Sequence, residues 1–323
     1  MTEVTYREAI AQAIIDEMHA DESVFLFGED VGAAGGAFKT TEGIFDIFGP
    51  RRVLDTPISE QAIVGCAIGA ALKGLRPVAE IMFADFAGVC FDQIANQLAK
   101  YRYMTDGQVS VPVTIRMANG AGGGFGAQHS QAAENWFLSI AGLKVVTPAT
   151  PADAYGLLRA AIRDEDPVLY FEHKGLFNTK GTIGGASLPI GVAEIVRAGT
   201  DATVVATQLM RHRASQAAGE LDAEGISIEV IDPRTLLPLD LDTIGRSVDK
   251  TGHLLCVQES ADAGSWGATV IAGVLDQHFE ALDAPPKLVG GDDTPIPYAA
   301  ELEDAWLPSV ERIKDAVRSN LEY

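Results

Sequence analysis

The sequence predicts a two-domain α/β protein built on parallel sheets covered by helices, and three observations support this fold class. Strand-like and helix-like segments alternate, with about 30 residues for each step of a strand and a helix. Residues 174–189 lose this periodicity and are rich in Gly and Thr, which is typical of a linker. The 323 residues, 47% of them apolar, suffice for about two domains with sizeable cores. We therefore expect domains at residues 1–180 and 190–323.

The elements follow from apolar periodicity and from their boundary residues. Residues 5–19 carry apolar side chains at helical spacing, and Thr5 with Glu8 makes a capping box. In the N-terminal domain we expect helices at 5–19, 44–48, 60–72, 89–104 and 151–162, and strands at 24–28, 76–83, 111–117, 143–148 and 167–172. In the C-terminal domain we expect strands at 202–206, 226–232 and 254–259, and helices at 214–225, 269–279 and 309–321. The second domain is smaller and has no comparable reactive cluster, so packing and assembly are its expected work.

Composition excludes several classes of partner. The net charge is −21, with 45 acidic and 24 basic residues. Nucleic acid and anionic membranes need a basic face, so a basic protein partner fits better. No apolar run reaches ~18 residues and the N-terminus lacks the pattern of a signal peptide, which predicts a cytoplasmic protein without a membrane span. The cysteines, Cys66, Cys90 and Cys256, lie far apart in apolar runs, so we expect buried thiols rather than a disulfide or metal site.

The stretch Asp55–Gln61 places an acid at the start of an apolar helix. Ser59 stands where a helix cap is expected, and the run after Glu60 is dominated by Ala, Gly and Ile. One interpretation of Glu60 is an exposed first-turn glutamate favoured by the helix dipole. The other is a carboxylate held in an apolar site to handle a proton.

A glycine-rich loop follows the predicted strand 111–117 and ends in the sequence Gln-His-Ser-Gln, with the histidine at His129. The residues Gly122, Gly124 and Ala127 formally match a dinucleotide fingerprint. That fingerprint requires a helix beginning in the glycines and an acid at the end of the next strand, and neither is present here. The sequence therefore argues against NAD, and His129 on pattern alone is a polar loop residue.

Two further residues occupy positions where open α/β sheets place ligands. Glu29 and Asp30 follow the strand 24–28, and a solvated turn is the preferred interpretation for Asp30. Phe86 lies just past the strand 76–83, and its spacing alone fits a core residue as well as a ligand-facing one.

The acid after Thr-Pro-Ile-Ser, the aromatic Phe86 and the Gln-His-Ser-Gln sequence occur together. In that combination the chain resembles, over nearly its whole length, the β subunit of the thiamine-diphosphate-dependent E1 component of 2-oxo acid dehydrogenase complexes. This family includes the pyruvate, acetoin and branched-chain enzymes. The resemblance implies a transketolase-like fold, with a parallel-sheet pyrimidine-binding domain followed by a smaller α/β C-terminal domain.

The resemblance also implies roles for individual residues. Glu60 would accept a hydrogen bond from N1′ of the cofactor's aminopyrimidine and favour the imino form that removes the thiazolium proton. Phe86 would pack on the pyrimidine, with Glu29 and Met82 as further cofactor-binding residues. His129 would assist acyl transfer to lipoamide, and histidine side chains can donate a proton near neutral pH.

The family's diphosphate site is missing from this sequence. The Gly-Asp-Gly sequence that holds the diphosphate through Mg²⁺ does not occur, so the oxygen ligands for Mg²⁺ must come from another chain. The resemblance implies an α subunit, an α2β2 heterotetramer, and docking of the E2 acyltransferase through its subunit-binding and lipoyl domains. It also implies a structural K⁺ held largely by main-chain oxygens of Val113, Ala161, Ile162, Asp164 and Asp166.

We therefore expect an oxidoreductase subunit, active only with an α subunit, that cleaves or decarboxylates a pyruvate- or acetoin-type substrate and passes the acyl group to E2 lipoamide. Three alternatives remain: a branched-chain 2-oxo acid E1 β subunit, a non-catalytic scaffold of the same fold, and a stand-alone transketolase-type enzyme. The missing Gly-Asp-Gly sequence and the short chain disfavour the last.

Overall fold

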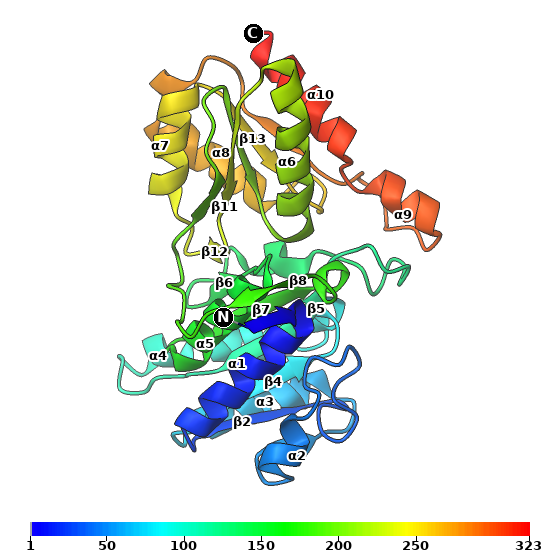
Figure 1. The fold of residues 1–323 in the computed structure, drawn as a ribbon. Helices are drawn as coiled ribbons and strands as arrows, with labels where there is room; N and C mark the ends of the chain where they lie inside the picture. Colours follow the sequence, from blue (N-terminus) through cyan, green and yellow to red (C-terminus); the bar gives the residue numbers. More distant parts are fainter. Residues whose placement is uncertain (1) are drawn as a thin grey trace. The chain divides into compact units, whose positions relative to one another are not determined.

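A computed structural model describes residues 2–323 and divides the chain into two compact units (Figure 1). Unit 1 consists of the residues up to Asn119 together with Trp136–Ile190. Unit 2 consists of Gly120–Asn135 and Gly191–Tyr323. The glycine-rich loop therefore belongs to unit 2, although the strand that precedes it belongs to unit 1.

Unit 1 is organised around a parallel sheet with the strand order β6-β7-β5-β4-β2-β3. These strands are β2 (Val24–Gly28), β3 (Val53–Asp55), β4 (Arg76–Ile81), β5 (Thr114–Asn119), β6 (Lys144–Val146) and β7 (Val168–His173). Every residue of β5 and β7 is buried, as expected when helices cover both faces of a parallel sheet. Such burial makes any charged residue within these strands notable.

The helical elements of unit 1 differ in whether a side chain caps their first turn. They are α1 (Tyr6–Ala20), α2 (Ile44–Phe48), α3 (Glu60–Ala71), α4 (Tyr101–Met104), α5 (Pro151–Arg163) and the shorter turns η1 (Ala84–Gly88), η2 (Gln93–Leu98) and η4 (Lys174–Leu176). The turn η3 (Ala133–Phe137) is divided in sequence between unit 2, up to Asn135, and unit 1, from Trp136. The predicted capping box of α1 is confirmed, with the Glu8 N–H bonded to Thr5 Oγ1 and the Thr5 N–H bonded to Glu8 Oε2.

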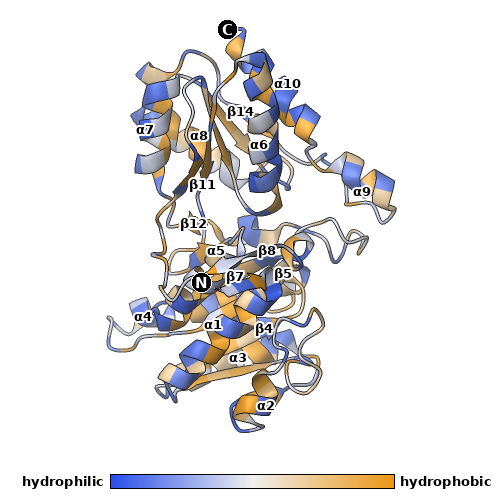
Figure 2. Ribbon diagram, in the orientation of Figure 1, coloured by the Kyte–Doolittle hydropathy of each residue, from blue (hydrophilic) through white to orange (hydrophobic). Residues whose placement is uncertain are grey.

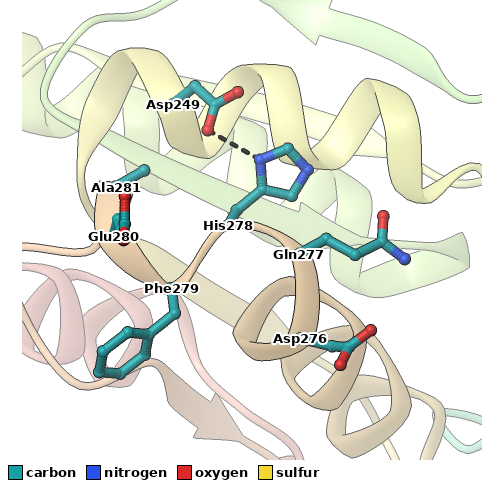
Figure 3. Close-up of a pocket in the computed structure, with 7 residues that line it drawn as sticks. All are labelled: Asp249, Asp276, Gln277, His278, Phe279, Glu280 and Ala281. Carbon is teal, nitrogen blue, oxygen red and sulfur yellow. Dashed lines mark hydrogen bonds and ion pairs between the residues drawn. The ribbon is translucent and has the colours of Figure 1, made fainter.

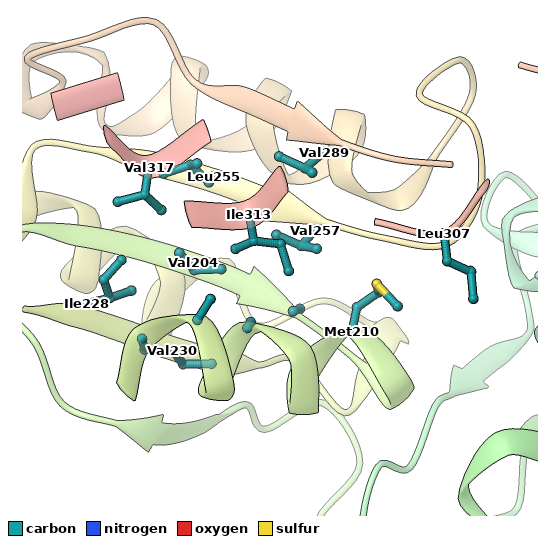
Figure 4. Packing of buried hydrophobic residues seen from close by; sticks show 14 of the residues in the cluster. Val204, Met210, Ile228, Val230, Leu255, Val257, Val289, Leu307, Ile313 and Val317 are labelled. Atoms are coloured by element: carbon teal, nitrogen blue, oxygen red, sulfur yellow. The ribbon is translucent and has the colours of Figure 1, made fainter. Parts of the chain in front are cut away.

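Unit 2 has a second sheet, with the order β14-β13-β10-β11-β9 and only β9 antiparallel. Its elements are β9 (Glu194–Arg197), β10 (Ala202–Ala206), α6 (Gln208–Leu221), η5 (Asp222–Glu224), β11 (Ile228–Asp232), β12 (Thr235–Leu237), α7 (Leu241–Thr251), β13 (Leu254–Val257), α8 (Trp266–Gln277), η6 (Phe279–Ala281), β14 (Lys287–Val289), α9 (Ala300–Trp306) and α10 (Val310–Leu321). Figure 2 shows mostly apolar strands between helices of mixed polarity. Figure 4 shows Val204 and Leu255 of the sheet in the same apolar core as Ile313 and Val317 of α10.

Two predicted segments differ in the structure. The predicted helix 89–104 is instead the π-helical turn η2 followed by the short α4, because the Ala99 N–H bonds the Ile94 carbonyl five residues earlier. Residues 174–189, predicted as a linker, include β8 (Lys180–Ile183), which pairs antiparallel with β1 (Thr2–Thr5) in unit 1. Main-chain pairing of this kind requires no side-chain periodicity, so the sequence showed none.

Helix α3 is buried on one face only. Ile63, Val64 and Ala67 are buried, whereas Cys66 is exposed, so the prediction that all three cysteines are buried is wrong. The helix is apolar on all sides, and such a helix is normally covered on all sides. In the single chain, the remaining apolar face of α3 is open to solvent.

Candidate active site

Glu60 is the first residue of α3, and its side chain is buried, with only 7% of the residue exposed. Ser59 occupies the capping position, but its hydroxyl does not bond the helix amides, so that part of the prediction is wrong. Among residues 2–323, no group donates a hydrogen bond to the Glu60 carboxylate. The structure thus favours a buried carboxylate over an exposed first-turn glutamate.

Glu29 lies at the end of β2 and is also 7% exposed. Burial raises the pKa of this carboxyl above its ordinary value, and the negative charges of Glu60, Asp30 and Glu80 raise the pKa further. Its Oε1 atom is buried and has no hydrogen-bond partner. Glu29 and Glu60 therefore form one electrostatically coupled pair, each with unused capacity to accept a hydrogen bond.

The loop after Glu29 is held by a hydrogen bond from its main chain to the side chain of Asp55. The Gly32 N–H donates to Asp55 Oδ1 at 2.7 Å. A Cβ on Gly32 would lie 2.6 Å from Asp55 Oδ2, so a larger residue here would require the carboxylate to shift. The Asp55 side chain thus ties the loop to the segment that leads into Glu60.

Phe86 belongs to an aromatic group beside the end of β4. It is half-buried in η1, and its ring packs edge-on against Phe83 at a centroid distance of 5.5 Å. Phe83 in turn contacts Phe38 at 5.4 Å. Met82, directly after β4, is also half-buried. Both predicted cofactor-binding residues, Phe86 and Met82, therefore keep apolar surface that a ligand could contact.

A buried ion network in the sheet was missed from the sequence. Arg116 in β5 is fully buried and bonds Glu80 of β4 at 2.9 Å and Glu172 of β7 at 2.6 and 2.9 Å. Desolvation outweighs attraction to Arg116 and raises the pKa of Glu172 to about 7. The sequence did contain a signal for this network, because Glu80, Arg116 and Glu172 are charged residues inside three otherwise apolar strand segments.

His129 lies in the part of the glycine-rich loop that belongs to unit 2, and it is half-buried. The main-chain N–H of His129 donates to the Gly126 carbonyl at 3.2 Å. Gly122, Gly124 and Gly126 have φ values of +95°, +66° and +75°, a conformation that favours glycine. The glycines therefore allow the backbone conformation of the loop, and no helix begins at them.

The main-chain oxygens predicted to bind K⁺ lie near cationic side chains. Arg76 Nη1 donates to the carbonyls of Ile162 and Asp164 at 3.2 and 3.0 Å. Lys144 bonds the Asp164 carboxylate at 2.6 and 2.7 Å. In the described part of the chain, no group of three His, Cys, Asp or Glu side chains could hold a metal, but a main-chain site does not need one. The K⁺ site, which also includes Val113, Ala161 and Asp166, stays a prediction.

Comparisons with known proteins identify the fold class. Residues 2–180 match the family model described as "Transketolase, pyrimidine binding domain", and residues 191–313 match "Transketolase, C-terminal domain". A solved structure described as "Split gene transketolase, inactive beta4 tetramer" superposes with a TM-score of 0.82. It covers 99% of this chain and 98% of its own, at 24% identity, and this likeness shows the fold alone. The chain is therefore a transketolase-like protein.

Curated relatives narrow this class to a family. "Pyruvate dehydrogenase E1 component subunit beta-2, mitochondrial" of Oryza sativa subsp. japonica is 47% identical, over 98% of this chain and 86% of its own length. "Acetoin:2,6-dichlorophenolindophenol oxidoreductase subunit beta" of Cupriavidus necator is 47% identical, over 97% and 96%. "2-oxoisovalerate dehydrogenase subunit beta" of Bacillus subtilis is 43% identical, over the full length of both. The chain belongs to the thiamine-diphosphate-dependent family of 2-oxo acid dehydrogenase E1 β subunits.

The relatives include bacterial and mitochondrial proteins. Within residues 2–323, no helix is long and apolar enough to cross a membrane. The cytoplasmic location stays a prediction.

Proposed function

We propose that this chain supplies the pyrimidine side of an E1 active site that acts on pyruvate or acetoin. The observation that carries the proposal is the buried Glu60 carboxylate at the start of α3, which has no hydrogen-bond donor among the described residues and lies in the field of Glu29. A carboxylate in this state fits a donor on a bound ligand. The residues present therefore fit the aminopyrimidine of thiamine diphosphate.

In this proposal each residue has a defined contact. When bound, thiamine diphosphate supplies the acidic thiazolium carbon through which oxo substrates are cleaved. Glu60 accepts the hydrogen bond from N1′, while Phe86 and Met82 provide apolar contact to the ring. Burial and the field of the Glu60 charge raise the pKa of the Glu29 carboxyl and favour its protonated form. His129 exchanges a proton with the substrate-derived group during its transfer to E2 lipoamide.

An α subunit completes the site in this proposal. Mg²⁺ and the diphosphate bind to that subunit, because this sequence contains no Gly-Asp-Gly. The open apolar face of α3, which includes Ala62, Cys66 and Gly69, supports assembly with other subunits in an α2β2 tetramer.

The E2 subunit-binding domain would dock on unit 2. Figure 3 shows a pocket of unit 2 lined by Asp249, Asp276 and Glu280, with Phe279 exposed beside them. Acidic groups around an apolar side chain suit a basic partner surface. We expect E2 binding to weaken as salt concentration rises, because ions screen such contacts.

Two measurements test the proposal. The first is binding of thiamine diphosphate with Mg²⁺, by calorimetry, to this chain alone and co-purified with its candidate α partner. We expect binding only in the pair, and tight binding to the single chain would overturn the shared site.

The second is turnover of the pair with pyruvate, acetoin and 2-oxoisovalerate. Turnover of pyruvate or acetoin is expected. Preference for 2-oxoisovalerate would select the branched-chain alternative.

A further inference from the structure

Helix α9 of unit 2 holds the loop that carries His129. Glu303, in the middle of α9, accepts a hydrogen bond from the Gly124 N–H through Oε2 at 2.9 Å. Glu303 is only 4% exposed, and its other oxygen, Oε1, is buried without a partner. A hydrogen bond from an amide to a buried carboxylate is about twice as strong as one between neutral groups. The contact therefore constrains the loop five residues before His129.

Glu303 is itself held in place by the core of unit 2. Trp306 and Leu307, just after it, belong to the apolar cluster of that unit. Trp306 Nε1 also donates to the Thr294 carbonyl at 3.1 Å. The carboxylate thus projects from a fixed element, which is what a residue that positions another must do.

The loop is also fixed at both of its ends. The Ala121 N–H donates to Glu259 Oε2 at 3.0 Å. At the other end, Asn135 donates to Ser260 Oγ at 2.8 Å and accepts from the Trp266 N–H at 2.7 Å. Between these anchors lie Gly122, Gly124 and Gly126, whose backbone can adopt more conformations than that of other residues. Glu303 bonds the loop at Gly124, between these two anchors.

We propose that Glu303 is a positioning residue for His129, holding the Gly124 amide so that the loop presents the imidazole in one place. The inference rests on the proposed function, in which His129 acts on the substrate-derived group. A displacement of about 1 Å in a reacting group is enough to cost on the order of a hundredfold in rate. Glu303 acts through the loop and needs no contact with substrate.

The test compares four variants in the complex co-purified with the α partner. Glu303→Ala removes the acceptor, and Glu303→Gln keeps a neutral acceptor of the same size. Glu301→Ala is the matched control, because Glu301 is an exposed acid on the same helix. His129→Ala removes the proposed catalytic group itself. Amide hydrogen exchange of residues 120–131 is measured beside kcat and KM.

We expect Glu303→Ala to speed exchange in residues 120–131 and to lower kcat about tenfold or more, with KM changed less than about twofold. Glu303→Gln should fall between this variant and the parent, and it decides the question where the alanine variant does not fold. Glu301→Ala should match the parent in both measurements.

The result that overturns the inference is unchanged exchange in the Glu303 variants, or faster exchange with full kcat. His129→Ala separates the two proposals, because it should lower kcat without changing exchange. Full activity of His129→Ala would refute the proposed role of His129, while the exchange data would still show whether Glu303 anchors the loop.

Discussion

Arg116 and Glu172 form a two-pronged ion pair inside the sheet of unit 1, with Nε–Oε1 at 2.6 Å and Nη2–Oε2 at 2.9 Å. The same guanidinium also bonds Glu80, so two buried carboxylates share one positive charge. Burial of an uncompensated charge is costly, and a proton retained on one of the two carboxylates neutralises that charge. This explains why the pKa of Glu172 rises to about 7 although Arg116 lies beside it.

The first prediction concerns pH. Because the pKa of Glu172 is about 7 in the folded protein and ordinarily 4.5, the folded state binds more protons between these values. The free energy of unfolding should therefore fall as pH rises through this window, by a few kcal/mol at most. Urea unfolding at several pH values measures this slope in the parent and in Glu172→Gln. An equal slope in both would show that Glu172 does not cause it.

The second prediction concerns Arg116 itself. Arg116→Leu leaves two buried carboxylates without their partner and should lower the free energy of unfolding by about 3–5 kcal/mol. The control is Arg102→Leu, because Arg102 pairs with Asp166 on the surface, where solvent screens the interaction. Chemical unfolding of both variants is the measurement. A loss in Arg116→Leu no larger than in the control would mean that the network contributes little.

The third prediction separates an enzyme subunit from a scaffold. Glu60→Gln removes the carboxylate that the proposed mechanism needs, and turnover with the α partner should fall about a hundredfold or more. Stability should hold or rise, since the parent buries this carboxylate without a hydrogen-bond donor. Gln61→Ala, at the exposed neighbouring position, is the control for the helix. Assembly with undiminished turnover in Glu60→Gln would favour the non-catalytic scaffold.

The ends of helices were predicted well where they depend on residues that are neighbours in the sequence. The capping box at Thr5 and the stop of α2 at Gly49 were read directly from neighbouring residues. The position of Glu60 at the start of α3 was also predicted, because the apolar run begins there. The whole-chain resemblance supplied the proposed roles of Phe86 and His129, which spacing alone left open.

Contacts between distant residues could not be predicted in this way. Arg116 meets Glu80 and Glu172 across 36 and 56 residues, and Glu303 meets Gly124 across 179. Periodicity reports which face of an element is apolar, but it does not report which charged groups converge when strands align. The π-helical turn η2 was missed for a related reason. The apolar spacing of a segment does not show whether its hydrogen bonds connect residues four or five positions apart.

The last prediction uses the cysteines to follow the open face of α3. Thiolates react with disulfide reagents, so exposure and pKa decide which cysteine is labelled. Cys66 is exposed, whereas burial raises the pKa of Cys90 to about 12 and also raises that of Cys256. In the folded single chain we therefore expect rapid labelling of Cys66 alone, which Cys66→Ser should abolish. Denaturant should release the two buried thiols.

The same reagent then tests assembly. If other subunits cover the apolar face of α3, Cys66 should react much more slowly in the complex with the α partner than in the single chain. The control is the rate of labelling after the complex is unfolded, which should equal that of the unfolded single chain. Equal reactivity of Cys66 in the folded complex and the folded single chain would show that this face stays open. The subunit contacts would then have to lie elsewhere on the chain.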